Sequence, residues 1–229
     1  MTAMNGSAPP GKSPDYWVAT VDLDRGAIDA MDQRRRAALI NSPSGFKSAN
    51  LVGTVDTERS SNLAIVSSLV HIGSHPPLLA LVFRPDSVER HTLDNIRSTG
   101  VYTINHVSHA MIDAAHQTAA RYPRGESEFA ATGLSECWEQ GWPAPFVGES
   151  RVRMALRLID EQELAVNGTH LVIGEVQHLH LPEDALTEDG ALDPAAAGTV
   201  ALAGLDSYYD ATLLQRMAYA KPDLPPRRR

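Results

Sequence analysis

Most apolar runs along the chain are short and are bounded by turn-forming residues, a pattern typical of β-strands. The run at 46–55 is followed by a polar turn at 56–61 and a second run at 62–70, so these two strands are expected to pair antiparallel. The pair Pro76-Pro77 ends this unit, because proline cannot donate a hydrogen bond to a central ladder. The near-continuous apolar run at 78–83 then predicts a strand that is buried on both faces.

The second half of the chain carries further strand patterns. Apolar and polar residues alternate at 152–158, and Asn167-Gly168 is a strong hairpin signal that leads into a long strand at 169–181. Shorter strands are expected at 16–21, 101–105 and 199–203. Helices are expected at 28–40, 92–100 and 108–121, the last two beginning at a hydroxyl-bearing cap. The stretches at 122–145 and 183–198 are interpreted as loops.

These elements predict a mainly β fold with peripheral helices. Six or seven strands, mostly joined by hairpins, favour an antiparallel barrel or sandwich over a doubly wound parallel sheet. We expect a leader and lead-in segment at 1–40, a barrel domain at 41–215 and a tail at 216–229.

Composition narrows the class of protein. Hydrophobic residues make up 43% and charged residues 21% of the 229, the balance of an ordinary globular chain. No apolar run approaches the roughly 18 residues that span a bilayer, and the first residues lack the apolar core of a signal peptide, so a cytoplasmic location is expected. The net charge of −8 argues against nucleic acid or an anionic membrane as a partner. Cys137 is the only cysteine, which excludes an intramolecular disulfide and a multi-cysteine metal site.

The common catalytic and nucleotide-binding motifs are absent. The sequence has no dinucleotide-binding or phosphate-loop glycine motif and no serine nucleophile elbow. Nine histidines invite a metal hypothesis, but none of them has zinc-site spacing. A metal-dependent enzyme therefore stays a minor alternative, and we expect no metal.

One cluster of polar residues is typical of an anion site. Arg84, Arg90, His91 and Thr92 converge on the start of the helix at 92–100, where free N–H groups and the helix dipole favour a phosphate. A capped surface helix with ordinary arginines nearby is the alternative. Ser67-Ser68, near the end of an apolar strand, would serve a polyhydroxyl ligand or merely satisfy local backbone groups.

The same stretch resembles a known family. The run N-L-A-I-V-S-S-L-V-H-I-G-S-H-P-P-L-L, followed by R-P-D-S-V-E-R-H-T-L-D-N-I-R-S-T-G-V-Y-T-I-N, is similar to the flavin reductase-like family, to which flavoredoxin belongs. Further matches follow in order: A-A-R-Y-P, E-F-A-A-T-G-L, A-P-F-V-G-E-S and V-I-G-E-V. The resemblance covers about residues 45–210 and implies an antiparallel split β-barrel that binds FMN.

The resemblance also implies which residues contact the cofactor. It assigns Asn62, Leu63 and Ala64 to the edge of the isoalloxazine ring. It assigns the ring and ribityl contacts to Ser67, Ser68 and Leu69. It assigns the phosphate to Arg84, His91 and Thr92.

Two further features of the cofactor site are expected. Lys47, at the start of the first barrel strand, is a further expected contact that the resemblance does not supply: a cation beside the flavin N1/O2 edge would stabilise negative charge on the reduced ring. An exposed strand-end lysine is the alternative. In the homodimers of such a family the partner subunit closes the site, so Tyr122 and the loop at 128–129 would reach across.

The implied activity is that of an oxidoreductase. FMN, or FAD, would take a hydride from NADH or NADPH and pass electrons to a small-molecule or protein acceptor. The alternatives are a flavin that is released as a substrate and a non-enzymatic flavin store or sensor. His71 and His75 depart from the family pattern, so they put substrate and pyridine-nucleotide specificity in doubt.

Overall fold

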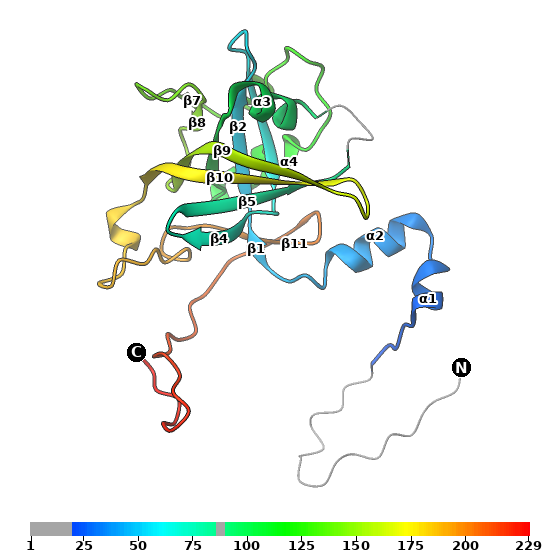
Figure 1. Cartoon of the computed structure of the whole chain (residues 1–229), viewed down its shortest axis with the longest axis vertical. Coiled ribbons are helices and arrows are strands. Elements are labelled where there is room, and N and C mark those ends of the chain that lie inside the picture. The colour runs from blue at the N-terminus through cyan, green and yellow to red at the C-terminus, as the bar shows by residue number, and fades with distance from the viewer. Residues whose placement is uncertain (1–19, 86–89) are drawn as a thin grey trace.

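The centre of the molecule is a seven-stranded sheet in which every neighbouring pair of strands is antiparallel (Figure 1). This computed structural model describes residues 20–85 and 90–229. The strands follow the order β3-β2-β6-β9-β10-β5-β4. Their bounds are β2 Asn50–Val55, β3 Ser61–Val66, β4 Val70–Ser74, β5 Pro77–Phe83, β6 Val101–His106, β9 Arg153–Leu164 and β10 Thr169–His180.

The sheet curls into a barrel with an open seam. Strands β3 and β4 lie at opposite edges of the sheet, yet only residues 67–69 separate them in sequence. Three residues cannot cross the width of a flat seven-stranded sheet, so the two edges must come together. The edges do not pair within the described sheet, and the Ser68 hydroxyl accepts a hydrogen bond from the Val82 N–H of β5 across 3.3 Å. The predicted antiparallel barrel is therefore confirmed.

Two of the predicted strands are each divided in two. The strand expected at 46–55 is β1 (Lys47–Ser48) followed by β2, and β1 pairs with β11 (Ala201–Ala203) in a separate sheet completed by β12 (Ser207–Tyr209). The strand expected at 62–70 ends at Val66 and resumes as β4. The strand expected at 78–83 is not buried on both faces, because Val82 is 41% exposed. The short strand expected at 16–21 lies mostly outside the described residues, and residues 20 and 21 are not part of a strand.

The barrel is packed on both faces of its central strands. Alternate side chains of β2 enter different clusters, with Leu51 beside Leu63 and Phe129 on one face and Val52 beside Ile104 on the other. All six residues of β2 are buried as a result. A small pair of strands, β7 (Glu136–Cys137) and β8 (Phe146–Val147), adds to this packing.

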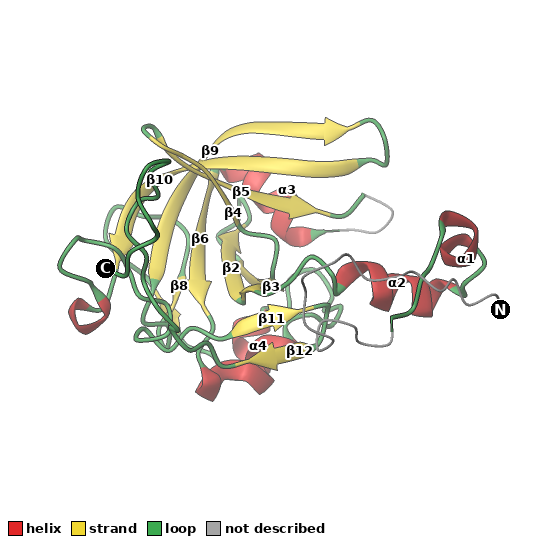
Figure 2. Ribbon diagram, turned by 90° about the horizontal axis from the view of Figure 1, so that it is seen from below, coloured by secondary structure: helices red, strands yellow, loops and turns green. Residues whose placement is uncertain are grey.

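The helices lie around the barrel (Figure 2). They are α1 Arg25–Asp29, α2 Gln33–Asn41, α3 His91–Thr99, α4 Ile112–Gln117 and α5 Glu128–Thr132, with short 3-10 turns at His109–Met111 and Glu183–Ala185. Helices α1 and α2 bury no residue and extend away from the barrel (Figure 1). Helix α3 packs its apolar side chains Leu93 and Ile96 into the core.

The helix predictions need three corrections. The single helix expected at 28–40 is two, because Asp24 and Asp32 each accept a hydrogen bond from the third residue after them and so begin a separate helix. Thr92 does not cap α3 but lies in its first turn, although Gly100 ends the helix as expected. The helix expected at 108–121 ends at Gln117, and the loop expected at 122–145 contains α5.

Candidate cofactor cleft at the barrel seam

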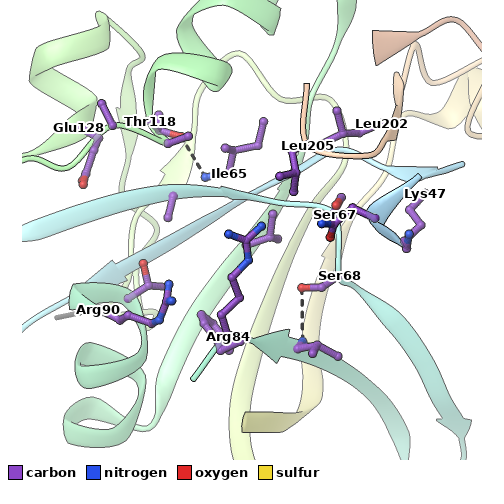
Figure 3. A pocket seen from close by; sticks show the side chains of 18 of the residues that line it. Lys47, Ile65, Ser67, Ser68, Arg84, Arg90, Thr118, Glu128, Leu202 and Leu205 are labelled. Carbon is purple, nitrogen blue, oxygen red and sulfur yellow. Dashed lines mark hydrogen bonds between the residues drawn. The ribbon is translucent and has the colours of Figure 1, made fainter. Parts of the chain in front are cut away.

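A cleft of about 940 Å³ lies along the seam of the barrel. It is bordered by the end of β3, the bend at 67–69, the end of β5, the start of α3, residues 118–122 after α4, and the β1–β11 pair. Figure 3 shows Arg90, Thr118 and Glu128 toward one end, Lys47, Leu202 and Leu205 toward the other, and Arg84 between them. The volume is near the upper end of the range of about 300–1,000 Å³ that small-ligand pockets occupy.

Eight of the ten predicted cofactor contacts line this cleft. They are Lys47, Asn62, Ala64, Ser67, Ser68, Arg84, His91 and Thr92. The two that do not are leucines: Leu63 is fully buried beside Phe129, and Leu69 packs against the interior of the barrel. The eight residues come from β1, β3, the bend at 67–69, the residue after β5 and the start of α3, and they meet in one cleft. The side chains of Leu63 and Leu69 pack behind it.

A buried polar network lies under the inner wall of the cleft. The Asn62 amide nitrogen donates to the hydroxyls of Thr92, at 3.0 Å, and Thr54, at 3.3 Å. The Asn95 amide nitrogen also donates to Thr54, at 3.1 Å. All four side chains are at most 7% exposed. The network thus joins β3 and α3, which line the inner wall, to β2 behind them.

The outer edge of β3 is satisfied by side chains and not by another strand. The N–H of Leu63 donates to the Glu128 carboxylate at 2.8 Å, and the N–H of Ile65 donates to the Thr118 hydroxyl at 2.9 Å. Ser67 is the next residue in this alternation and lines the cleft. Burial raises the pKa of Glu128, although the hydrogen bond from Leu63 opposes that shift.

The charge of the cleft is opposite to that of the whole chain. Lys47, Arg84, Arg90 and Arg121 line it, whereas Glu128 is the only carboxylate among the described residues of its lining, and the chain carries −8 overall. The Nε of Arg90 is buried and has no hydrogen-bond partner among the described residues. A buried, unpaired guanidinium N–H is costly unless an acceptor is supplied, so this wall of the cleft suits an anionic ligand.

Lys47 has a partner of its own. Its Nζ donates to the Ser44 hydroxyl at 2.6 Å, which holds the ammonium at the β1 end of the cleft. The lysine is partly exposed and lines the cleft, with Ser67 lying between it and Arg84 (Figure 3).

Several lining residues were not predicted as contacts of this chain's own site. Thr118 and Arg121 come from the end of α4 and the turn after it, and Leu202 and Leu205 come from β11 and its turn. Tyr122 and Glu128 were expected to reach into a partner's site, but both line the cleft of their own chain. The A-A-R-Y-P match was the available signal for Arg121 and Tyr122, whereas the apolar pattern of β11 carried none.

The histidines that depart from the family pattern lie outside the cleft. His71 and His75 are exposed on and after β4 and are not among the lining residues. Within 20–85 and 90–229, no three His, Cys, Asp or Glu side chains come close enough to share a metal ion. The same residues contain no helix of the length and apolarity needed to cross a membrane.

Comparison with known proteins identifies the family. The family model described as "Flavin reductase like domain" matches residues 44–218. An uncharacterized protein of Deinococcus radiodurans is 30% identical over 168 residues, which are 70% of this chain and 73% of that protein.

Two solved structures have the same fold. One is a protein of Shewanella frigidimarina assigned as a flavin reductase with a split barrel domain. It is 47% identical with a TM-score of 0.85, over 88% of this chain and 100% of that one. The other, flavoredoxin of Desulfovibrio vulgaris, is 26% identical with a TM-score of 0.62, over 78% of this chain and 91% of that one. The seam between β3 and β4 is thus the opening of a split barrel, and the chain belongs to the flavin reductase-like family.

Proposed function

We propose that this protein is an FMN-binding oxidoreductase that accepts a hydride from NADH or NADPH and passes electrons to a second substrate. The observation that carries the proposal is the cationic cleft at the seam, where the described lining residues include four basic side chains and one carboxylate in a chain of net charge −8. The Shewanella relative and flavoredoxin support a flavin as the ligand. FAD would present the same ring and a longer phosphate end.

The phosphate would bind at the start of α3. Arg84 reaches into the middle of the cleft (Figure 3), and Arg90, His91 and Thr92 surround the helix N-terminus. The N–H groups of a helix's first turn have no partner within the helix, so they and the guanidinium groups would share the phosphate charge. Among the described residues, Arg84 makes no hydrogen bond or ion pair that would compete, and its side chain is exposed.

The ring and ribityl chain would lie along β3 and the bend after it. Asn62 and Ala64 face the cleft from β3, and Ser67 and Ser68 add hydroxyl groups at the bend. Lys47 would place its charge beside the ring at the other end. When bound, the flavin supplies the hydride-accepting chemistry, and the protein supplies orientation and electrostatics.

The acceptor side of the cleft would be completed by a second copy of the chain. The cleft is open in one subunit, and its volume leaves room for a pyridine nucleotide or an acceptor beside a mononucleotide. A homodimer that closes the site would exclude water from it.

The decisive experiment is to purify the protein, identify any released chromophore, and mix the loaded protein anaerobically with NADH and, separately, with NADPH. Loss of absorption at about 450 nm with either donor is expected for the reductase. A bound flavin that neither donor bleaches would replace the reductase with a flavin store or sensor. Michaelis behaviour in free FMN, with loss of the colour on dialysis, would make the flavin a substrate.

A further inference from the structure

Thr54 lies behind the cleft and lines none of it. It is fully buried near the end of β2, next to β3 in the sheet. Its hydroxyl oxygen accepts hydrogen bonds from the amides of Asn62, on β3, and Asn95, on α3. One buried oxygen therefore links the strand that would carry the ring to the helix that would carry the phosphate.

The network determines which atom Asn62 offers to a ligand. A carboxamide nitrogen has two hydrogens. In Asn62 one is directed to Thr54 and the other to Thr92, at 3.3 and 3.0 Å. The side chain also lines the cleft, so its carbonyl oxygen is the group left to face a ligand. Asn62 would then act as an acceptor, which suits an N–H or O–H of the ligand.

The network also fixes the rotation of α3. Leu93 and Ile96 hold the helix to the barrel by apolar packing, which is not directional. The hydrogen bonds of Asn95 and Thr92 are directional, and they lie on the same helix as the groups that would bind phosphate. A small rotation of α3 would move His91 and the free N–H groups away from the cleft.

We propose that Thr54 is a positioning residue that couples the ring and phosphate portions of the cofactor site by holding Asn62 and α3 in register. This inference rests on the proposed function for the identity of the ligand. The position of α3 does not depend on which ligand binds, so the role of Thr54 and the proposed cofactor can be tested separately.

Three variants test the proposal. Thr54→Val keeps the shape and removes the acceptor, and Thr54→Ser keeps the acceptor. Thr103→Val is the matched control, because Thr103 is a fully buried threonine on β6 that accepts from the Asn105 amide at 3.0 Å but does not line the cleft. Both valine variants remove one buried hydroxyl from the same sheet.

The first measurement is hydrogen exchange of the ligand-free protein, followed by mass spectrometry. Thr54→Val is expected to speed exchange in residues 91–99, whereas Thr54→Ser and Thr103→Val leave that segment unchanged. The second is the dissociation constant of FMN and of riboflavin by fluorescence quenching. Thr54→Val should weaken FMN binding by about tenfold and reduce the preference for FMN over riboflavin. Thr54→Ser should restore most of the FMN affinity and most of that preference.

The outcomes separate the two proposals. Unchanged exchange in 91–99, or an effect of Thr54→Val no larger than that of Thr103→Val, would overturn the role of Thr54. Wild-type protein that binds neither ligand would overturn the proposed cofactor, and the exchange measurement would then decide the role of Thr54 alone.

Discussion

The Leu63 N–H and the Glu128 carboxylate are joined by a hydrogen bond of 2.8 Å between residues 65 positions apart in the chain. The contact attaches α5 to the edge of β3, which has no strand beside it on that side within residues 20–85 and 90–229. Leu63 was predicted to lie at the ring edge, but its N–H is used by Glu128 and its side chain by the core. Glu128 is therefore the group that completes the edge strand beside the cleft.

Replacing Glu128 by alanine is expected to destabilise the fold. The Leu63 N–H would be buried without an acceptor, at a cost of about 1–3 kcal/mol. Glu128→Gln keeps an acceptor and should cost less. Urea unfolding measures both, and Glu58→Ala, at an exposed turn position, is the control. A Glu128→Ala variant as stable as that control would show that the contact contributes nothing.

The same pair predicts a pH dependence of stability. Because burial raises the pKa of Glu128, the unfolded chain loses this proton first as the pH rises. The wild type should therefore lose stability relative to Glu128→Gln as the pH rises from the ordinary carboxyl range through the raised pKa. Unfolding at a series of pH values tests the sign, and a difference that moves the other way would contradict the shift.

Arg84→Ala is expected to weaken FMN binding by roughly 1.5–3 kcal/mol, the value of a charge-assisted hydrogen bond. Riboflavin, which lacks the phosphate, should bind both proteins almost equally. Arg157→Ala is the matched control, since Arg157 is an exposed arginine on β9 that does not line the cleft. Isothermal titration measures the constants, and an unchanged FMN constant would remove Arg84 from the site.

His106 makes a second contribution to the pH dependence. Its Nδ1 lies 2.9 Å from the Thr199 hydroxyl, and burial lowers its pKa to about 4 from 6.5. Between these two values the unfolded chain takes up a proton that the folded chain does not. Stability present above pH 6.5 should fall as the pH drops toward 4, by about 2–3 kcal/mol at most. His106→Gln should flatten this part of the curve, and an equal slope in both proteins would be evidence against a buried neutral imidazole.

The sequence was sufficient for the barrel and for most of the inner wall of the cleft. Strand patterns and the hairpin signals are local, so the pairing of β2 with β3 and of β9 with β10 followed from neighbouring residues. The family resemblance placed Asn62, Arg84 and Thr92 together although they lie on three elements, and all three line the cleft.

The parts that were missed depend on contacts between distant segments. The break between β1 and β2 falls at Ala49, whose N–H donates to Val200 and whose carbonyl accepts from Val107. No local pattern announces partners that are more than fifty residues away. Glu128 was placed in a loop for the same reason, because a carboxylate in a polar stretch gives no sign that it will be buried against β3.

The Tyr102 hydroxyl is a polar group within the apolar core. It is buried and has no hydrogen-bond partner among the described residues, and burial raises the pKa of Tyr102. Tyr102→Phe should therefore leave stability unchanged or raise it by up to about 1 kcal/mol. Gly174→Ala should destabilise by about 1–3 kcal/mol, since a Cβ there would collide with that hydroxyl and its ring carbon. The double variant should lose less stability than Gly174→Ala alone. Thermal unfolding of all three variants measures this difference, and strict additivity of the two single effects would contradict the contact.

The final prediction concerns the second copy of the chain. Phe46 is 68% exposed, follows the arm formed by α1 and α2, and precedes Lys47 in the cleft wall. Its exposed ring beside the open cleft is therefore a place to test whether a second copy of the chain packs there. We expect a particle of twice the 24.8 kDa of one chain, measured by light scattering. Phe46→Glu should shift it toward the monomer and weaken FMN binding at the same time, because the partner would close the cleft.

The matched control for that variant is Val166→Glu. Val166 is 88% exposed in the turn between β9 and β10, away from the cleft lining, so a charge there should change neither mass nor affinity. Measuring the FMN constant across a dilution series separates the two effects of Phe46→Glu, since a shared site loses affinity as the dimer dissociates. A wild-type monomer that holds FMN with the same constant at every concentration would mean that each chain binds the cofactor alone.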